Sequence, residues 1–168
     1  MLFDLAAAAP DAPAIDDGTR RRTRAELADR VNRTARHLRE VAGAPADGHV
    51  ATLTANRSEA VELVLAATVA GLWVTAVNVH LTPEEVAYVL GDCGASVVVC
   101  DPEHEPVVHA ALASPAVAGA GGDHPSGASP RVEVLGPAWE AALAAASDEP
   151  FPLDGPAGGT MLYTSGTT

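Results

Sequence analysis

The last eleven residues of the chain, 158–168, join an apolar segment to a run of small hydroxyl side chains. Residues 161–163 are Met-Leu-Tyr, which suits a strand, and residues 164–168 are Thr-Ser-Gly-Thr-Thr. A glycine among hydroxyl residues after a strand allows several backbone N–H groups and hydroxyl donors to point at one anion. The pattern therefore predicts a phosphate-binding loop at 164–168, with a flexible polar tail as the alternative on local sequence alone.

The charge of the chain limits the kinds of anion site that it can form. All ten basic residues are arginine, against 22 acidic residues and a net charge of −12. Without lysine there is no GxxxxGK[ST] loop, and no GxGxxG follows the first strand. An acidic chain is also a poor match for nucleic acid or an anionic membrane. The one basic cluster, Arg20–Arg22 with Arg24, is interpreted as the solvated end of a strand.

A group of acidic and histidine residues resembles a metal site in composition only. It contains Asp101, Glu103, His104, Glu105 and His109. The two histidines are five positions apart, so they do not share a helix face, and acidic residues are ordinary in the first turn of a helix. We predict no metal site and assign no catalytic residue.

The remaining reactive or aromatic residues have structural interpretations. Cys93 and Cys100 form no CxxC pair and have no basic neighbour, so both are predicted to be reduced and partly buried thiols. Trp73 and Trp139 are predicted in the core. His80, which follows a strand, is interpreted as structural, with a role in lining a pocket as the alternative.

Strand and helix patterns alternate along the chain, whose length of 168 residues fits one domain with a real core. A hairpin is predicted at 13–23, around Asp17-Gly18. Strands are predicted at 49–56, 72–79, 95–101, 132–136 and 160–164. Helices are predicted at about 23–42, 59–70, 83–92, 102–113 and 137–146. The alternation predicts an α/β fold with a mostly parallel sheet flanked by helices.

Several local signals place these elements. Thr23 with Glu26, and Thr82 with Pro83 and two acidic residues, have the pattern of helix starts, and Ser58 is predicted to cap the helix that follows it. In parallel sheets ligands bind beyond the carboxyl ends of the strands. Residues 164–168 would lie at such an end.

Two longer stretches require separate interpretations. Residues 63–79 carry no charge, but their polar residues and central glycine favour a helix followed by a buried strand over a membrane span. Asp4 stands where a signal peptide would need positive charge, so the protein is predicted to be soluble and cytoplasmic. Residues 114–131, rich in Gly, Pro and Ser, are predicted to form a flexible surface loop.

The segment Met-Leu-Tyr-Thr-Ser-Gly-Thr-Thr at 161–168 resembles the opening of the phosphate loop of the adenylate-forming enzymes, [YF]-T-S-G-[ST]-T-G-x-P-K-G. This superfamily includes acyl-CoA synthetases, peptide-synthetase adenylation domains and luciferases. Residues 56–101 resemble the AG…VNxxLTxxE…Dcg stretch of the fatty-acyl-CoA ligases, and residues 78–85 look more like those ligases than like peptide synthetases. The resemblance implies that residues 1–168 form the N-terminal part of an AMP-binding domain, an incomplete large domain.

The resemblance implies a two-step reaction in the parent enzyme. A carboxylate, expected to be a fatty acid, would attack the α-phosphate of Mg²⁺-bound ATP, and CoA would then displace AMP to give a thioester. The residues carried over to the phosphate cradle are Thr164, Ser165, Gly166, Thr167 and Thr168. The second half of the family's loop, with its lysine, and the catalytic lysine of the C-terminal domain are missing. The chain alone is therefore expected to be inactive.

Two alternatives remain open at this point. The chain would instead be a stand-alone α/β binding or interaction module, or part of another adenylate-forming enzyme, such as a peptide-synthetase adenylation domain or an aryl-CoA ligase. A sheet that ends at its last strand is expected to leave apolar surface uncovered, which would promote self-association. The sequence does not identify the acid.

Overall fold

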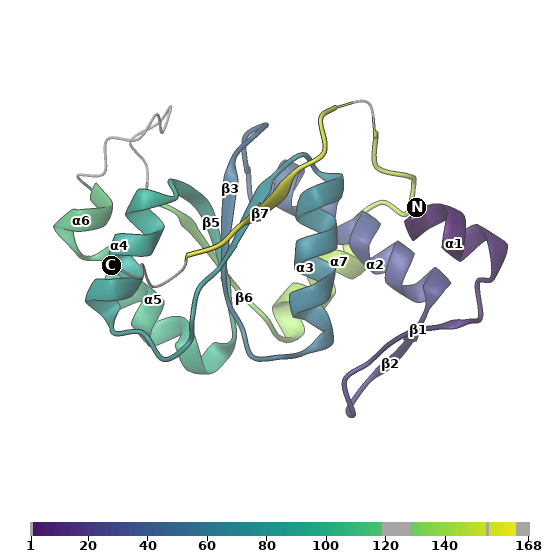
Figure 1. Cartoon of the computed structure of the whole chain (residues 1–168), viewed down its shortest axis with the longest axis horizontal. Helices are drawn as coiled ribbons and strands as arrows, with labels where there is room; N and C mark the ends of the chain where they lie inside the picture. The colour runs from purple at the N-terminus through teal and green to yellow at the C-terminus, as the bar shows by residue number, and fades with distance from the viewer. Residues whose placement is uncertain (1, 119–128, 154, 164–168) are drawn as a thin grey trace.

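The computed structural model describes residues 2–118, 129–153 and 155–163, which form helices and strands in alternation (Figure 1). The strands are β1 (Pro13–Asp16), β2 (Arg21–Thr23), β3 (His49–Leu53), β4 (Trp73–Ala76), β5 (Ala95–Cys100), β6 (Arg131–Val134) and β7 (Gly159–Met161). The α-helices are α1 (Leu2–Ala8), α2 (Arg24–Arg36), α3 (Ser58–Val69), α4 (Pro83–Asp92), α5 (Glu105–Leu112), α6 (Pro115–Ala118) and α7 (Pro137–Ala145). A π-helical turn, η1 (His37–Val41), follows α2, and a 3₁₀ turn, η2 (Pro102–His104), precedes α5.

The main sheet has five strands in the order β6-β5-β3-β4-β7, and each neighbouring pair is parallel. β1 and β2 form a separate antiparallel hairpin. The predicted α/β fold with a mostly parallel sheet is confirmed, and so are the hairpin and each of the five predicted strands, although the strands are shorter than predicted. All five strands of the main sheet therefore present their carboxyl ends at one edge.

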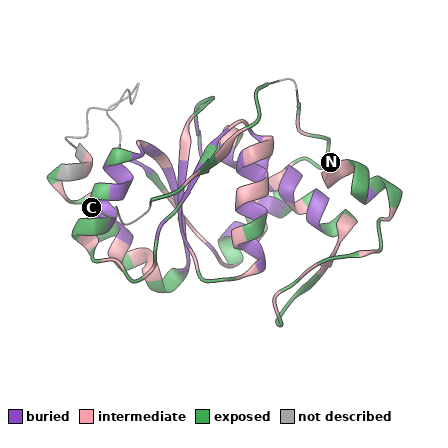
Figure 2. Ribbon diagram, viewed as in Figure 1, coloured by how far each residue is buried: buried purple, intermediate pink, exposed green. Residues whose placement is uncertain are grey.

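Helices cover both faces of this sheet (Figure 1). The alternation of side chains along β5 shows the division: Val97 and Val99 pack with α2, α3 and α7, whereas Val98 and Cys100 pack with α4 and α5. Figure 2 shows the buried residues concentrated on the strands and on the helix faces turned toward them. A strand buried on both faces needs an unbroken apolar run, as in residues 97–100.

The predicted helix starts are confirmed at Thr23 and Thr82 and wrong at Ser58. Thr23 N–H donates to Glu26 at 2.7 Å and its hydroxyl accepts from the Glu26 N–H at 3.3 Å, and Thr82 forms the same box with Glu85. Arg57 is instead the N-cap of α3, and the Ser58 hydroxyl donates to Asp17 at 2.5 Å. The Ser58 hydroxyl, which the local sequence predicts as the helix cap, thus binds the carboxylate of Asp17, which is distant in sequence.

Three further segments differ from the sequence prediction. The helix predicted to run to residue 42 changes to the π-helical turn η1 at His37. The helix predicted at 102–113 is divided into η2 and α5, because Pro106 has no N–H to continue the helix from the preceding turn. Helix α1 was not predicted. Of the loop predicted at 114–131, residues 119–128 lie outside the described residues, and residues 115–118 are helical.

The two tryptophans occupy different environments. Trp139 is buried, as predicted, whereas the prediction for Trp73 is wrong: it is 39% exposed, and its indole N–H donates to Asp47 at 2.9 Å. In the part of the chain that the structure describes, no helix is long and apolar enough to cross a membrane.

Candidate functional site

The predicted phosphate-loop residues Thr164, Ser165, Gly166, Thr167 and Thr168 lie outside the described residues, so their role stays a prediction. The strand that leads to them is described. β7 pairs with β4 in parallel register, Gly159 opposite Trp73 and Met161 opposite Thr75. The chain therefore leaves β7 at the carboxyl edge of the sheet.

Tyr163, the last described residue, connects this exit to α4. Its hydroxyl donates to a carboxylate oxygen of Asp92, the last residue of α4, at 2.5 Å. Partial burial and this hydrogen bond raise the pKa of Tyr163 above its ordinary value. The tyrosine hydroxyl thus remains a hydrogen-bond donor across the physiological pH range and fixes the residue that precedes Thr164.

The entry to β7 depends on a close approach of two backbone segments. Gly158 N–H donates to the Thr68 carbonyl at 2.9 Å, at the end of α3. A Cβ at position 158 would lie 1.9 Å from the carbonyl oxygen of Leu72. Only glycine fits there.

Asp101 links the carboxyl ends of two neighbouring strands. It directly follows β5 and is 1% exposed. One carboxylate oxygen accepts from the Ala55 N–H at 2.7 Å, just beyond β3, and the other accepts from Arg57 at 2.5 Å. The hydrogen bonds that Asp101 accepts from Ala55 and Arg57 thus hold together the loops that follow β3 and β5.

The same aspartate belongs to the one group of metal-ligand atoms that the described residues bring within 4.8 Å of one another, Asp101 with Glu103 and His104. Both Asp101 oxygens are already occupied, by Ala55 and Arg57. Glu103 is exposed. These contacts indicate a structural role for Asp101, and the group does not fit a divalent cation.

Buried acidic residues on α3 bind the arginines of the hairpin. Glu59, 2% exposed, accepts from Arg57 at 2.8 Å and from Arg20. Burial alone would raise the pKa of Glu59, but the hydrogen bonds and positive charge of these arginines outweigh it and lower the pKa. Asp17 in the hairpin turn accepts from the hydroxyl and N–H of Ser58, and hydrogen bonds led by that hydroxyl lower its pKa.

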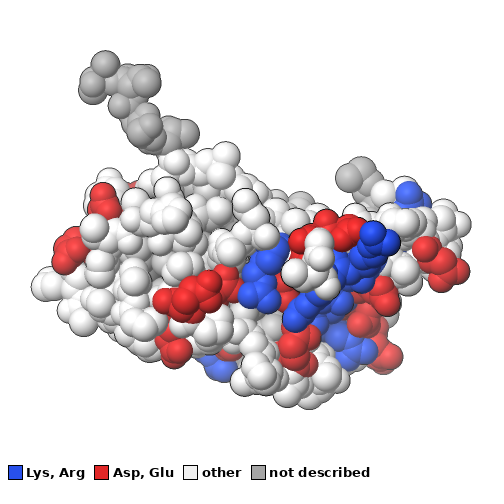
Figure 3. All heavy atoms as spheres, turned by 90° about the horizontal axis from the view of Figure 1, so that it is seen from below, with Lys and Arg blue, Asp and Glu red and all other residues white. Residues whose placement is uncertain are grey.

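A second buried acid connects four elements. Glu62, 1% exposed, lies 2.6 Å from Arg22 of β2 and 2.9 Å from Arg30 of α2. Arg30 also binds Glu140 of α7 at 2.5 Å. Figure 3 shows basic and acidic side chains interleaved on one face of the molecule.

The interpretation of Arg20–Arg22 with Arg24 as a solvated strand end is therefore wrong for Arg22, whose side chain is 16% exposed and pairs with Glu62 of α3. The side chains of Arg20 and Arg21 are 44% and 86% exposed, as the prediction requires, although Arg20 also pairs with the buried Glu59. The sequence signal that could have predicted this pairing is the presence of Glu59 and Glu62 in an otherwise apolar helix, because buried acids require cationic partners.

The remaining candidates from the sequence are two cysteines and His80. Both cysteines are free and buried, as predicted, and burial raises the pKa of Cys100 to about 11. Thiols of this kind are poor nucleophiles near neutral pH. His80 is exposed, and its backbone N–H donates to the Asn78 side chain at 3.0 Å.

The architecture defines the class of protein: a parallel α/β sheet whose edge strand β7 leads into a glycine- and hydroxyl-rich segment. The model of the family described as "AMP-binding enzyme" matches residues 2–168. The chain belongs to this family.

Relatives and solved structures agree with this assignment. A feruloyl-CoA synthase from Amycolatopsis sp is 37% identical over 163 residues, covering 95% of this chain and 29% of that protein. A Mycobacterium tuberculosis fatty acyl CoA synthetase superposes with a TM-score of 0.81 at 25% identity, covering 98% of this chain and 32% of that one. Apo MatB from Rhodopseudomonas palustris superposes with a TM-score of 0.78 at 30% identity, covering 99% of this chain and 32% of that one. The chain thus spans about 29% of the length of the feruloyl-CoA synthase that it matches.

Proposed function

We propose that the protein carrying this chain is an ATP-dependent ligase that converts a carboxylic acid to its CoA thioester, and that residues 164–168 hold the nucleotide phosphates. The observation that supports this most directly is the parallel pairing of β7 with β4, because ligands of parallel α/β sheets bind beyond the carboxyl ends of the strands. The family match over residues 2–168 supports the same reaction class.

The reaction requires hydrogen-bond donors around the phosphates of ATP. Carboxylate and triphosphate are both negative, so the phosphate charge must be neutralised before the carboxylate attacks the α-phosphate and pyrophosphate leaves. In our proposal the backbone N–H groups and hydroxyls of Thr164, Ser165, Thr167 and Thr168 donate to the phosphates, and Gly166 permits close approach. Mg²⁺ would neutralise further charge, but Glu59 and Asp101 are paired with Arg57 and do not fit as its ligands.

A fatty acid is our first candidate for the acid that is activated. The fold match to a fatty acyl CoA synthetase supports it. An aryl acid is the second candidate, and the higher sequence identity to a feruloyl-CoA synthase, 37%, favours it. Exchange assays with decanoate and with ferulate as alternative acids would separate the two.

We also propose that these 168 residues alone do not complete the reaction, because the chain corresponds to about 29% of the length of a curated relative. The proposal extends to a cytoplasmic location, where ATP and CoA are available, and to no role in nucleic-acid binding, since the net charge is −12. Exposed apolar side chains such as Leu162 and Tyr88 support self-association of the isolated chain, which light scattering would detect.

The test is ATP–pyrophosphate exchange in the protein that carries this chain. Gly166→Val should lower exchange at least tenfold, because a side chain would obstruct the approach of the phosphates, whereas Thr160→Val on the exposed side of β7 should leave it unchanged. Full exchange by Gly166→Val would refute the phosphate-loop assignment. Exchange by the purified 168-residue chain would refute its proposed inactivity.

A further inference from the structure

A pair of adjoining cavities lies at the opposite edge of the sheet from the proposed phosphate loop. The residues around them include Asp47, Gly71 and Pro156, which precede β3, β4 and β7. Because these strands are parallel, this is the amino edge. The cavities therefore belong to a different site.

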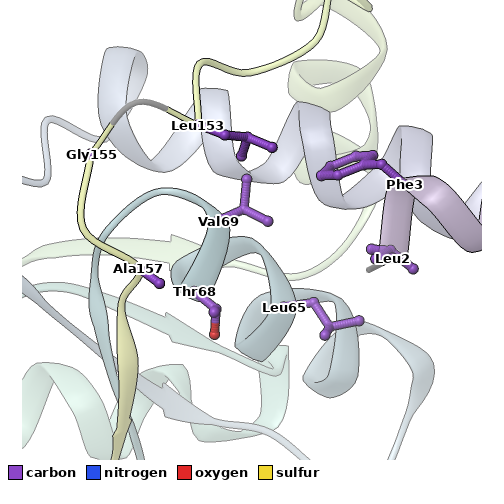
Figure 4. Close-up of a pocket in the computed structure, with 8 residues that line it drawn as sticks. All are labelled: Leu2, Phe3, Leu65, Thr68, Val69, Leu153, Gly155 and Ala157. Atoms are coloured by element: carbon purple, nitrogen blue, oxygen red, sulfur yellow. The ribbon is translucent and has the colours of Figure 1, made fainter.

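The first cavity, of about 300 Å³, is apolar (Figure 4). Leu2 and Phe3 of α1 face Leu65 and Val69 of α3 across it, and Leu153 lies over Val69. Thr68 supplies the one hydroxyl among the described residues of its wall, and this hydroxyl already donates to the Val64 carbonyl at 2.9 Å. This cavity suits a hydrocarbon group and offers it no hydroxyl donor.

The second cavity, of about 370 Å³, is lined by a cationic side chain. It shares Val69 and Gly155 with the first and is lined also by Arg39, which projects from the π-helical turn η1. Within the described part of the chain, Arg39 forms no ion pair, and its buried Nη1 has no hydrogen-bond partner. A buried guanidinium nitrogen without an acceptor is costly, and π-helical turns often occur at functional positions.

Asp47, the other charged residue among the described residues of this wall, is not within ion-pair distance of Arg39. One of its carboxylate oxygens accepts from the Trp73 indole at 2.9 Å. The backbone at Asp47 is left-handed, with φ of 59°. Asparagine tolerates that conformation and can accept the same hydrogen bond, so Asp47→Asn removes a negative charge with little change in structure.

We propose that the two cavities form one binding site for an amphipathic carboxylate, with the carboxylate on Arg39 and its hydrocarbon chain between α1 and α3. Guanidinium groups bind carboxylates through two parallel hydrogen bonds, which suits a planar anion better than a neutral head group. The net charge of −12 opposes general anion binding, so binding here must come from the local arginine. The proposal does not depend on the ligase assignment.

The test is isothermal titration of the protein that carries this chain with decanoate, and with acetate and 1-decanol as probes of the head and the tail. Arg39→Met should weaken decanoate binding at least tenfold, Arg39→Lys less, and Asp47→Asn should tighten it several-fold. Arg24→Met is the matched control, because Arg24 carries the same charge, is half-buried and lies outside both cavity walls. Leu153→Ser, at a 64% exposed position, should weaken decanoate and decanol alike.

Thermal melting of each variant separates loss of binding from loss of folding. The proposal is overturned if the wild-type protein does not bind decanoate, if acetate binds as tightly, or if Arg39→Met and Arg24→Met behave alike. Decanoate bound at a reaction centre on the other edge of the sheet would be insensitive to Arg39→Met. That outcome would refute this site and leave the proposed function standing.

Discussion

Replacing Glu62 by glutamine tests whether the buried ion pairs hold the hairpin and helices together. Glu62→Gln keeps the volume of the side chain and removes its charge. Arg22, with a side chain 16% exposed, would lose its ion-pair partner, whereas Arg30 would keep Glu140 at 2.5 Å. Removing one partner of a buried ion pair costs about 3–5 kcal/mol.

For a domain of this size each kcal/mol lowers the melting temperature by about 2–4 °C, so a loss of about 6–20 °C is expected. Differential scanning calorimetry and urea denaturation would measure it. The matched control is Glu40→Gln, which breaks the ion pair between Glu40 and Arg36. The Glu40 side chain is 55% exposed, so this loss should cost less than about 1 kcal/mol. High salt should remove the effect at Glu40 but not that at Glu62, since buried pairs are poorly screened.

The double variant Arg22→Met with Glu62→Met refines this prediction. Replacing both members of a buried pair with apolar residues is often neutral, so the double variant should recover much of the stability that Glu62→Gln loses. If Glu62→Gln melted within 2 °C of the wild type, the buried network would not stabilise this part of the fold, and the reasoning would be refuted.

Three other perturbations have defined outcomes. Gly158→Ala should destabilise the chain by about 1–3 kcal/mol in urea denaturation, because its Cβ would lie 1.9 Å from a backbone oxygen, whereas Gly155→Ala, with nothing within 4 Å, should not. Burial raises the pKa of Cys100 to about 11, so iodoacetamide at pH 7 should label it only after unfolding; native labelling seen by mass spectrometry would contradict this. Hydrogen bonds led by the Ser58 hydroxyl lower the pKa of Asp17, so the stability that this carboxylate adds should be complete above about pH 5 and should fall progressively as the pH is lowered; an equal difference in stability between the wild type and Asp17→Asn at pH 3 and pH 7 would contradict this.

The helix starts, the buried strand and the helix end that the sequence predicted correctly depend on local interactions. The capping boxes at Thr23 and Thr82 join residues three positions apart, and the apolar run at 97–100 is buried on both faces wherever the strand lies in a parallel sheet. Gly71, in the left-handed conformation with φ of 68°, ends α3 as predicted. Each signal is complete within a few residues, so tertiary contacts did not alter it.

The errors involve side chains whose partners are distant in sequence. Ser58 was predicted as a cap, but Asp17, 41 positions earlier, takes its hydroxyl. Trp73 was predicted in the core, but Asp47 holds its indole at the surface. One sequence does not show which distant carboxylate a polar hydrogen will meet, because that depends on how the hairpin and helices pack.

Two arginines of this fold each bind two carboxylates. Arg30 binds Glu62 and Glu140 at once, and Arg57 binds Glu59 and Asp101, which requires the extended fork of a guanidinium. In the described structure every arginine except Arg24 and Arg39 has such an acidic partner. The chain has 22 acidic residues, so carboxylate partners for arginine are abundant. Arg39 is half-buried beside an apolar cavity and has no acidic partner among the described residues, which is best explained by a carboxylate that comes from outside the described chain.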